Sequence, residues 1–397
     1  MKLRTLIVAC AAHVAHDGFT DLLYVMFPIW QRELGLSLAA VGLLRSLYSG
    51  AMSLFQLPSS LVAERAGART MLVAGTALVA FCYAIASTRS TYVALAVALF
   101  AAGIGASVQH PIASNLISKA YEGGRTRVVL GTYNFSGDVG KMLIPSLVAA
   151  LLIVMPWRHV LLVVAGIGVA VAAGIAIFAP STRIARNADA PRRDAAGRGR
   201  TLTPGFLLLL AIGAIDNATR TGFLTFLPFV IIDKGTPTQT VGFALTLIFA
   251  GGAAGKFVCG FLGDRLGILA TVCITEGLTA LGIVALHPLG LKATFAVLPL
   301  IGIALNGTSS VLYGTVPELV PPQRRQHAFG VFYTISTGAS ALSPVAAGAL
   351  SDAFGIPALM GAVAVLVLLT IPLAIGLQTT LRSVSPGKIA QPGGASG

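Results

Sequence analysis

Long apolar runs separated by short polar stretches make up most of this chain. Each run can place about 20 residues in the hydrocarbon core of a bilayer, which is what a helix needs to cross it. The pattern therefore predicts an all-α membrane protein with twelve transmembrane helices. The predicted spans are roughly residues 5–31, 38–63, 69–87, 92–118, 126–154, 158–179, 204–232, 239–262, 268–286, 292–318, 327–351 and 356–378.

The composition supports this prediction. Of the 397 residues, 55% are hydrophobic and 10% charged, whereas about a quarter of the residues of a soluble protein are charged. The net charge of +13 would suit a nucleic-acid partner, but the cations gather in alternate loops, as a membrane orientation signal does. With both termini cytoplasmic, the inner segments hold 18 Lys and Arg and the outer loops hold 5. We therefore expect a multi-pass protein of the cell inner membrane with both termini cytoplasmic, and no nucleic-acid partner.

A basic stretch rich in small residues divides the chain into two halves. Its composition is typical of a flexible linker. We predict an N-terminal six-helix bundle at 1–179, a cytoplasmic linker at 180–203, a C-terminal six-helix bundle at 204–380 and a cytoplasmic tail at 381–397.

Prolines and glycines recur at matching places in the two halves. Ordered matches of this kind indicate a duplication, and carriers built from two repeats bind their substrate near the midplane between them. The sequence therefore predicts two pseudo-symmetric bundles with a cavity between them. The clearest matches are Pro28 with Pro228 and Gly42 with Gly242 at an offset of 200, and Pro145 with Pro344 at an offset of 199.

The loop after the second predicted span carries a motif that recurs after the eighth. It reads Ser60–Arg69 in the first half and Gly260–Gly267 in the second. Together with twelve spans and a basic linker, it resembles the major facilitator superfamily, which implies the major facilitator fold and a cytoplasmic gate at this loop. A solvated turn between two helices is the alternative. The gating residues that the resemblance implies are Glu64, Arg65, Asp264 and Arg265.

More narrowly, the chain looks like the fosmidomycin-resistance branch of that superfamily. The resemblance implies an exporter of a drug or small metabolite, driven by the proton gradient. The chain departs from the branch at Ile112, where we expect a carboxylate, and at Asp138 and Lys141, which add charges to the fifth span. The matching stretches are His13–Asp17 with Phe27-Pro28, Ala106–Pro111, Gly123–Arg125 and Gly131–Pro145.

Nine acidic and basic residues, counting Asp, Glu, Lys and Arg, lie inside the predicted spans and away from their ends. Charges there are costly unless they pair or face water, so they mark a candidate functional site. The spacing predicts pairs between Asp138 and Lys141 and between Asp216 and Arg220, and similar depth predicts a pair between Asp21 and Arg45. Each pair can also be a static salt bridge between helices. The acids are Asp17, Asp21, Asp138, Asp216 and Glu276, and the bases are Arg45, Lys141, Arg220 and Lys256.

The candidate roles follow from chemistry. Proton coupling needs a group that gains and loses a proton, for which we name Asp17, Asp21, Glu276 and His110. A histidine that caps or packs a helix at a proline kink is the alternative for His110. Guanidinium and ammonium groups bind carboxylates or phosphonates, so the cations predict an anionic or zwitterionic substrate. Simple packing is the alternative for the aromatic and amide members of the binding set. The predicted substrate-binding residues are Arg45, Tyr24, Asn134, Asp138, Lys141, Asp216, Arg220, Asn306 and Tyr333.

Taken together, these features favour a proton-coupled secondary transporter that exports a small anionic or zwitterionic compound, such as an antibiotic, an organic acid or a phosphonate. Uptake of an organic anion by proton symport is the alternative, and a transporter-like sensor that carries nothing is a third possibility. The chain has no phosphate-binding glycine loop, nucleophile motif or metal-ligand spacing. We therefore expect no enzyme activity, cofactor or metal, and a monomer whose partners are the substrate, protons and the lipid bilayer.

Overall fold

Helices make up the secondary structure throughout the described part of the chain. The computed structural model describes residues 2–88, 91–121, 126–180, 203–321 and 324–384. Most of the predicted linker, the tail from residue 385 and the stretch Gly123–Arg125 lie outside these ranges. The helices are α1 (Lys2–Asp21), α2 (Leu23–Leu34), α3 (Leu38–Ala66), α4 (Ala68–Thr88), α5 (Tyr92–Ala106), α6 (Gln109–Ala120), α7 (Thr126–Val154), α8 (Trp157–Phe178), α9 (Pro204–Asp233), α10 (Thr240–Ala285), α11 (Leu291–Leu319), α12 (Arg325–Leu368) and α13 (Thr370–Val384).

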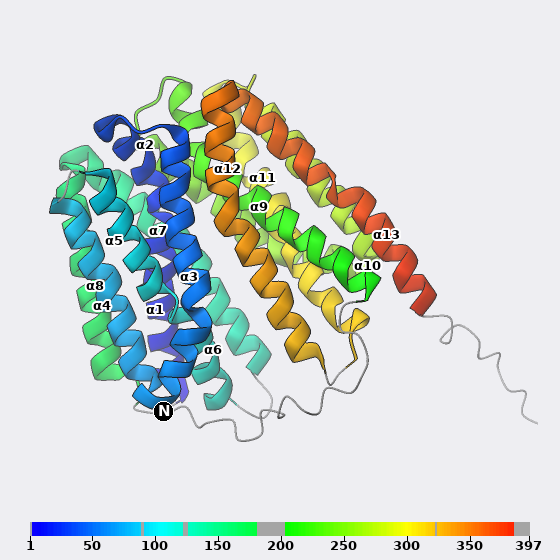
Figure 1. Cartoon of the computed structure of the whole chain (residues 1–397), viewed down its shortest axis with the longest axis horizontal. Coiled ribbons are helices and arrows are strands. Elements are labelled where there is room, and N and C mark those ends of the chain that lie inside the picture. The colour runs from blue at the N-terminus through cyan, green and yellow to red at the C-terminus, as the bar shows by residue number, and fades with distance from the viewer. Residues whose placement is uncertain (1, 89–90, 122–125, 181–202, 322–323, 385–397) are drawn as a thin grey trace, which may run out of the picture.

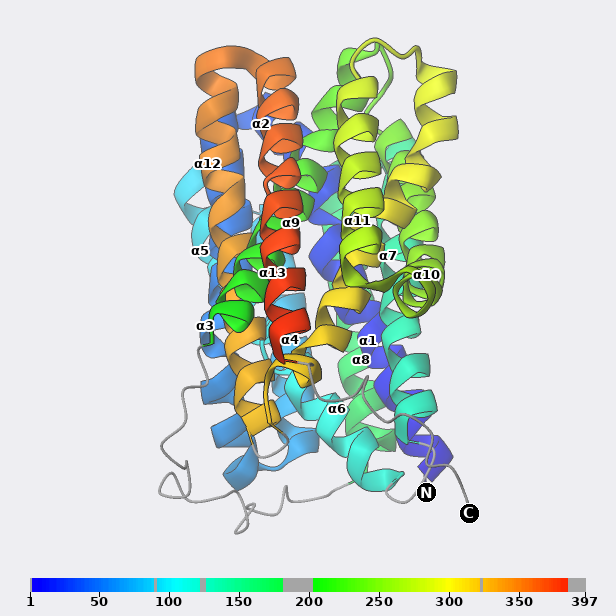
Figure 2. The same ribbon diagram turned by 90° about the vertical axis from the view of Figure 1, so that its right-hand side faces the viewer.

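The number of membrane crossings agrees with the apolar pattern once two long helices are divided. Ten helical segments of the described residues are long and apolar enough to cross a membrane. Two of them turn at a glycine with a left-handed φ, which is 78° at Gly267 in α10 and 83° at Gly355 in α12. Glycine adopts this conformation without steric cost. Counting each divided helix as two crossings gives the predicted twelve, and Figure 2 shows the second turn where α12 folds back toward α13.

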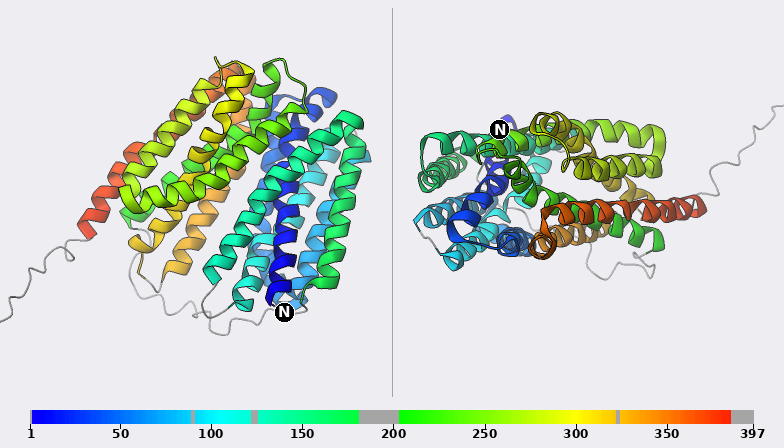
Figure 3. Two further views of the ribbon diagram at one scale, coloured as in Figure 1. Left: turned by 180° about the vertical axis from the view of Figure 1, so that it is seen from behind. Right: turned by 90° about the horizontal axis from the view of Figure 1, so that it is seen from above.

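Two bundles form the molecule. Helices α1–α8 make the first and α9–α13 the second, and Figure 1 shows them meeting at the end near α2 and diverging toward the N-terminus. The view from behind shows the same arrangement (Figure 3, left). The structure is therefore closed at the end remote from the N-terminus.

Repeat-related glycines make the close contact at this end. A Cβ atom on Gly42 of α3 would overlap the backbone of Pro344 on α12, and one on Gly242 of α10 would overlap Ala149 and lie 3.1 Å from the carbonyl oxygen of Pro145 on α7. The matched positions in the sequence thus form matched contacts between the two bundles. Small residues let membrane helices approach at backbone distance.

Polar contacts strengthen the closed end. The Asp352 carboxylate accepts hydrogen bonds from the backbone N–H groups of Leu38 and Ala39, both at 2.8 Å. An acid from the second bundle therefore caps the first turn of α3, where orphan N–H groups and the helix dipole favour negative charge. On the other side of the contact, the hydroxyl groups of Ser146 and Thr246 share a hydrogen bond.

Replacing Gly42 with valine should prevent this closure. Overpacking typically costs about 1–3 kcal/mol, so we expect a lower unfolding temperature, measured by thermal denaturation in detergent. Gly166→Val is the matched control, because no heavy atom outside its own helix lies within 4 Å of a Cβ atom there. Equal stability losses in the two variants would contradict the assigned contact.

Candidate functional site

The spacing of residues along α1 and two breaks between helices bring the polar side chains together. His13, Asp17 and Asp21 lie one turn apart on α1, so they share a face of the helix. The helix stops at Asp21, immediately before the junction with α2. A second break after Ala106 places His110 in the first turn of α6. The result is a polar cluster inside an otherwise apolar bundle.

A cavity of about 270 Å³ lies between the two bundles at this cluster. Both bundles contribute cations and polar groups to its lining. Of the predicted site residues, those that line the cavity are Asp17, Asp21, Tyr24, Arg45, His110, Lys141, Arg220, Asn306 and Tyr333. Asp138, Asp216 and Glu276 are buried and do not line the cavity, and Asn134 is exposed on α7.

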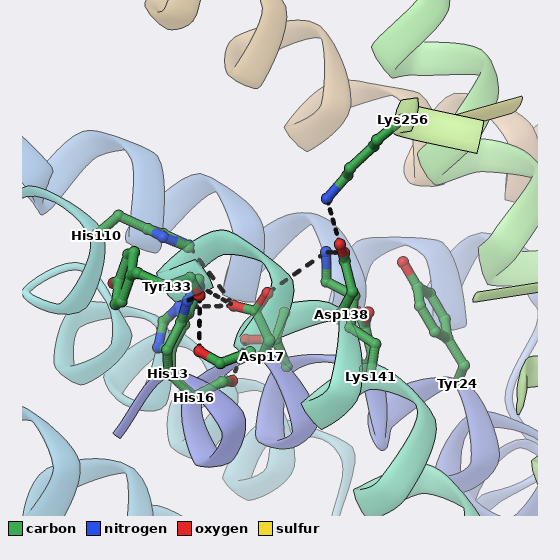
Figure 4. Close-up of polar contacts among 12 residues, drawn as sticks. His13, His16, Asp17, Tyr24, His110, Tyr133, Asp138, Lys141 and Lys256 are labelled. Carbon is green, nitrogen blue, oxygen red and sulfur yellow. Dashed lines mark hydrogen bonds and ion pairs between the residues drawn. The ribbon is translucent and has the colours of Figure 1, made fainter. Parts of the chain in front are cut away.

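Asp17 is the centre of the cluster. Its Oδ1 atom lies 3.3 Å from His13 Nε2, and 3.8 Å from the Nε2 atoms of both His16 and His110. Its Oδ2 atom lies 3.4 Å from Lys141 Nζ. Figure 4 shows the histidines on one side of the carboxylate and the lysine on the other.

The hydrogen bond of His13 Nδ1 determines the tautomer of its imidazole ring. His13 Nδ1 lies 2.7 Å from the backbone oxygen of Tyr133, and because a carbonyl oxygen only accepts, Nδ1 carries the hydrogen. In a neutral His13, Nε2 is then a bare acceptor that faces a carboxylate, and two acceptors repel. A proton on either Nε2 or Asp17 turns this contact into a hydrogen bond. The geometry therefore forms a proton-binding pair, which the four-residue spacing of His13 and Asp17 could have indicated.

A metal ion is the other cation that such donors could hold. The donor atoms of His13, Asp17 and His110 all lie within 4.8 Å of one another. However, the Lys141 ammonium group at 3.4 Å from Asp17 already supplies a positive charge there, which disfavours a divalent cation by repulsion. The donor atoms therefore suit a proton better than a divalent cation.

Arg45 donates hydrogen bonds through two of its three guanidinium nitrogen atoms, and its buried Nε atom has no hydrogen-bond partner. Its guanidinium group lies 3.7 Å from Asp21 Oδ1 and donates hydrogen bonds of 2.9 Å to the backbone oxygen of Thr20 and to the hydroxyl group of Tyr24. It also lies 4.7 Å from the centre of the Tyr24 ring, a cation–π contact. The structure thus contains the pair predicted with Asp21. These contacts tie α3 to the α1–α2 junction and leave little of Arg45 for a ligand.

The second bundle presents a cation of its own to the cavity. Arg220 on α9 lies 4.0 Å from Asp216, the partner that the spacing predicts, and donates a hydrogen bond to Asn217. Asp216 and Glu276 are 2% and 1% exposed. The long distance to Asp216 leaves Arg220 open to a closer anionic partner.

Asp138 has a nearer partner than the predicted one. Its Oδ1 atom lies 3.6 Å from Lys141, as the spacing predicts, but its Oδ2 atom accepts a 2.6 Å hydrogen bond from Lys256 on α10. Lys256 belongs to the other bundle and is 118 residues away in sequence. Sequence reasoning could not find this partner, because spacing along one helix says nothing about the facing helix.

The predicted gating residues lie at the end where the bundles diverge. Glu64, Arg65, Asp264 and Arg265 are all exposed. The Arg265 guanidinium lies 4.4 Å from the centre of the Phe261 ring. Among the described residues, no ion pair across the bundles involves these four side chains.

The sequence and the fold both match known transporters. The family model of the Major Facilitator Superfamily matches residues 9–234 and 209–396. The "Uncharacterized MFS-type transporter YfnC" of Bacillus subtilis (strain 168) is 25% identical over 380 residues, covering 92% of this chain and 91% of the relative. The "Probable L-galactonate transporter" of Escherichia coli (strain K12) is 26% identical over 144 residues, which are 36% of this chain and 32% of that protein. The Escherichia coli "Multidrug resistance protein MdtL" is 25% identical over 193 residues, 48% of this chain and 49% of the relative.

Solved structures show the fold alone. A bacterial homolog of the human lysosomal transporter Spinster superposes with a TM-score of 0.80 at 16% identity, over 97% of this chain and 99% of the other. The nucleoside transporter NupG superposes with a TM-score of 0.72 at 13% identity, over 97% and 99% of the two chains. The architecture is therefore that of a known class of membrane transporters.

Replacing Arg45 with methionine should destabilise the protein, because the buried Asp21 carboxylate loses its cation. Breaking a buried ion pair in this way costs about 3–5 kcal/mol. Thermal unfolding in detergent measures the effect. The double variant Arg45→Met/Asp21→Asn should recover part of the stability, and a double variant as unstable as the sum of its singles would contradict the pairing.

Proposed function

Because the chain belongs to the major facilitator superfamily, we propose that this secondary transporter is driven by the proton gradient and exports a small anionic or zwitterionic compound. The observation that carries the proposal is the Asp17 cluster. There the His13 Nε2 atom faces the Asp17 carboxylate, and a proton on either group would join them by a hydrogen bond. Asp17 lines the cavity between the bundles. A group that exchanges a proton at this place can respond to whichever side the cavity faces.

Lys141 and Arg220 are the proposed ligands of the substrate. They reach the cavity from opposite bundles, and their ion pairs of 3.4, 3.6 and 4.0 Å are longer than close hydrogen-bonded pairs. A carboxylate or phosphonate group bound between them would contact both bundles at once. Asn306 and Tyr333 also line the cavity and can donate hydrogen bonds to such a group.

The position of Asp17 favours a zwitterion among these substrates. A cationic group on the substrate would pair with Asp17, and a proton on Asp17 would remove that partner. Proton and substrate then compete, which is the requirement for antiport. The names of two relatives support parts of this proposal, since one concerns an organic acid anion and another concerns multidrug resistance.

Proton-coupled uptake of a simple anion is the second candidate, and the Lys141–Asp17 pair favours it. A proton on Asp17 would free Lys141 to bind the anion, so proton and substrate would bind together and move together. The direction of flux separates the two candidates. In everted vesicles under an imposed pH gradient, substrate accumulation that requires protons to move in the same direction would contradict export.

We further propose that the protein lies in the cell inner membrane as a monomer, with both termini cytoplasmic. The bundles at 1–179 and 204–380 would then rock about the cavity, and the present conformation would be open to the cytoplasm. The exposed gating residues, such as Arg65 and Asp264, would meet when that end closes. The stretches His13–Asp17 and Ala106–Pro111 support a place in the fosmidomycin-resistance branch.

Replacing Asp17 with asparagine should abolish gradient-driven transport and leave exchange or binding partly intact, because the amide keeps the size of the side chain but takes no proton. Transport by proteoliposomes with and without a pH gradient measures this. Wild-type uphill transport in Asp17→Asn would refute the role of Asp17.

Replacing Lys141 or Arg220 with methionine should weaken substrate binding. Losing a charged hydrogen-bond partner costs about 1.5–3 kcal/mol, or about 10- to 150-fold in affinity. A thermal-shift screen of phosphonates, organic acids and zwitterionic antibiotics on the wild type supplies the ligand for this measurement. Lys292→Met, at an exposed position outside the cavity, is the control. Unchanged affinity in both cavity variants would contradict the assignment.

A further inference from the structure

Lys256 links the two bundles inside the membrane. Its Nζ atom on α10 donates a 2.6 Å hydrogen bond to Asp138 Oδ2 on α7. Asp138 is 6% exposed. Within the membrane-spanning part that the structure describes, this is the ion pair that joins one bundle to the other.

The pair is the last link in a row of alternating charges. Asp17 Oδ2 lies 3.4 Å from Lys141 Nζ, the same Nζ atom lies 3.6 Å from Asp138 Oδ1, and Asp138 Oδ2 binds Lys256. Figure 4 shows this row running from the histidine cluster to α10. Two cations from different bundles therefore share one carboxylate, each through its own oxygen atom.

We propose that Lys256 is the positioning residue through which the charge of Asp17 controls the contact between the two bundles. When Asp17 is ionised, Lys141 is divided between Asp17 and Asp138. A proton on Asp17 removes the attraction between Asp17 and Lys141, so that Lys141 then pairs with Asp138 alone. Asp138 is then neutralised from its own bundle, and its attraction for Lys256 becomes weaker.

The place of the pair suits this role. It joins the same two helices whose remote parts close at the contact of Gly242 with Pro145 and at the hydrogen bond of Ser146 with Thr246. Asp138 lies two turns of α7 before Pro145, on the side toward the diverging end. The ion pair therefore belongs to the same α7–α10 contact, about two helical turns nearer the diverging end than the glycine contact.

The other charged and titratable groups nearby act on Asp17 or on a different partner. The Nε2 atoms of His13, His16 and His110 face Asp17 Oδ1, which is the oxygen remote from Lys141. In the second bundle, Arg220 pairs with its own Asp216. Asp21 of α1 pairs with Arg45 of α3, and the phenol of Tyr333 on α12 lines the cavity. Protons on these groups can change the charge at Asp17, but the structure gives them no ion pair with Asp138 or Lys256.

Spin labels at the closed end test the proposal without any substrate. Cysteines replacing the exposed residues Arg32 and Ala353 carry the labels, in the full chain with its four native cysteines replaced, in nanodiscs. Double electron–electron resonance measures the distance between them in mildly acidic and mildly alkaline buffer. In the otherwise wild-type protein, acid should increase the population with a long distance.

Replacing Lys256 with methionine should raise the long-distance population in alkaline buffer by about fivefold or more, the usual lower range of coupling between sites, and should remove its dependence on pH. Lys256→Arg should restore the dependence, because it keeps the charge, whereas a purely structural defect would not respond to charge. Lys292→Met is the matched control at an exposed lysine.

The inference rests on the proposed proton site. The variant Asp17→Asn shows whether a negative result means that the role of Lys256 is wrong or that the proton site is wrong. If Lys256→Met keeps the wild-type dependence on pH while Asp17→Asn loses it, the proton site stands and the role of Lys256 is wrong. If Asp17→Asn also keeps the dependence, the proton site itself is wrong and the proposal for Lys256 falls with it.

Discussion

The cost of holding the Asp17 carboxylate in an apolar interior governs the rest of this structure. A buried ion keeps its charge only if nearby groups replace the water that it has lost, and the penalty for an unpaired one is several kcal/mol. Asp17 is 7% exposed and is surrounded by three histidines and a lysine. Lys141, one of these partners, also pairs with Asp138. The chain of pairing crosses from one bundle to the other for this reason.

The cost of burying a charge also separates the cations of this site into a structural one, Arg45, and two proposed ligands, Lys141 and Arg220. Arg45 is buried against Asp21, Tyr24 and a backbone oxygen, so it stabilises the α1–α2 junction. The side chains of Lys141 and Arg220 are 30% and 22% exposed, against 7% for Arg45, which is why we propose these two as the ligands of the substrate. Charge alone therefore does not mark a ligand of the substrate. The exposure of the cation to the cavity distinguishes the two proposed uses.

Most of the fold could be predicted from the sequence, because few backbone structures are stable within a bilayer. Backbone groups in hydrocarbon must be satisfied within each helix, so apolar runs of sufficient length give the spans directly. The repeat also predicted which glycines and prolines matter, and Gly42 and Gly242 indeed meet the opposite bundle beside Pro344 and Pro145. The domain boundaries and the residues of the linker stay predictions.

The candidate site could be predicted only along single helices. Spacing found Asp138 with Lys141 and Asp216 with Arg220, but not Lys256, because its approach to Asp138 depends on how α7 and α10 face each other. Asn134 lies one turn before Asp138 toward the diverging end, which explains why it is exposed although Asp138 is buried. The hydrogen bond of His13 to Tyr133 links α1 to α7, and it needed the structure as well.

Proton release on ligand binding shows whether proton and substrate compete for Asp17. Purified protein in weakly buffered solution is mixed with the zwitterionic ligand that gives the largest thermal shift, and a pH indicator follows the free protons. Competition at Asp17 predicts that the wild type releases protons and that Asp17→Asn releases none. Binding that takes up protons, or that releases as many from Asp17→Asn as from the wild type, would contradict the account.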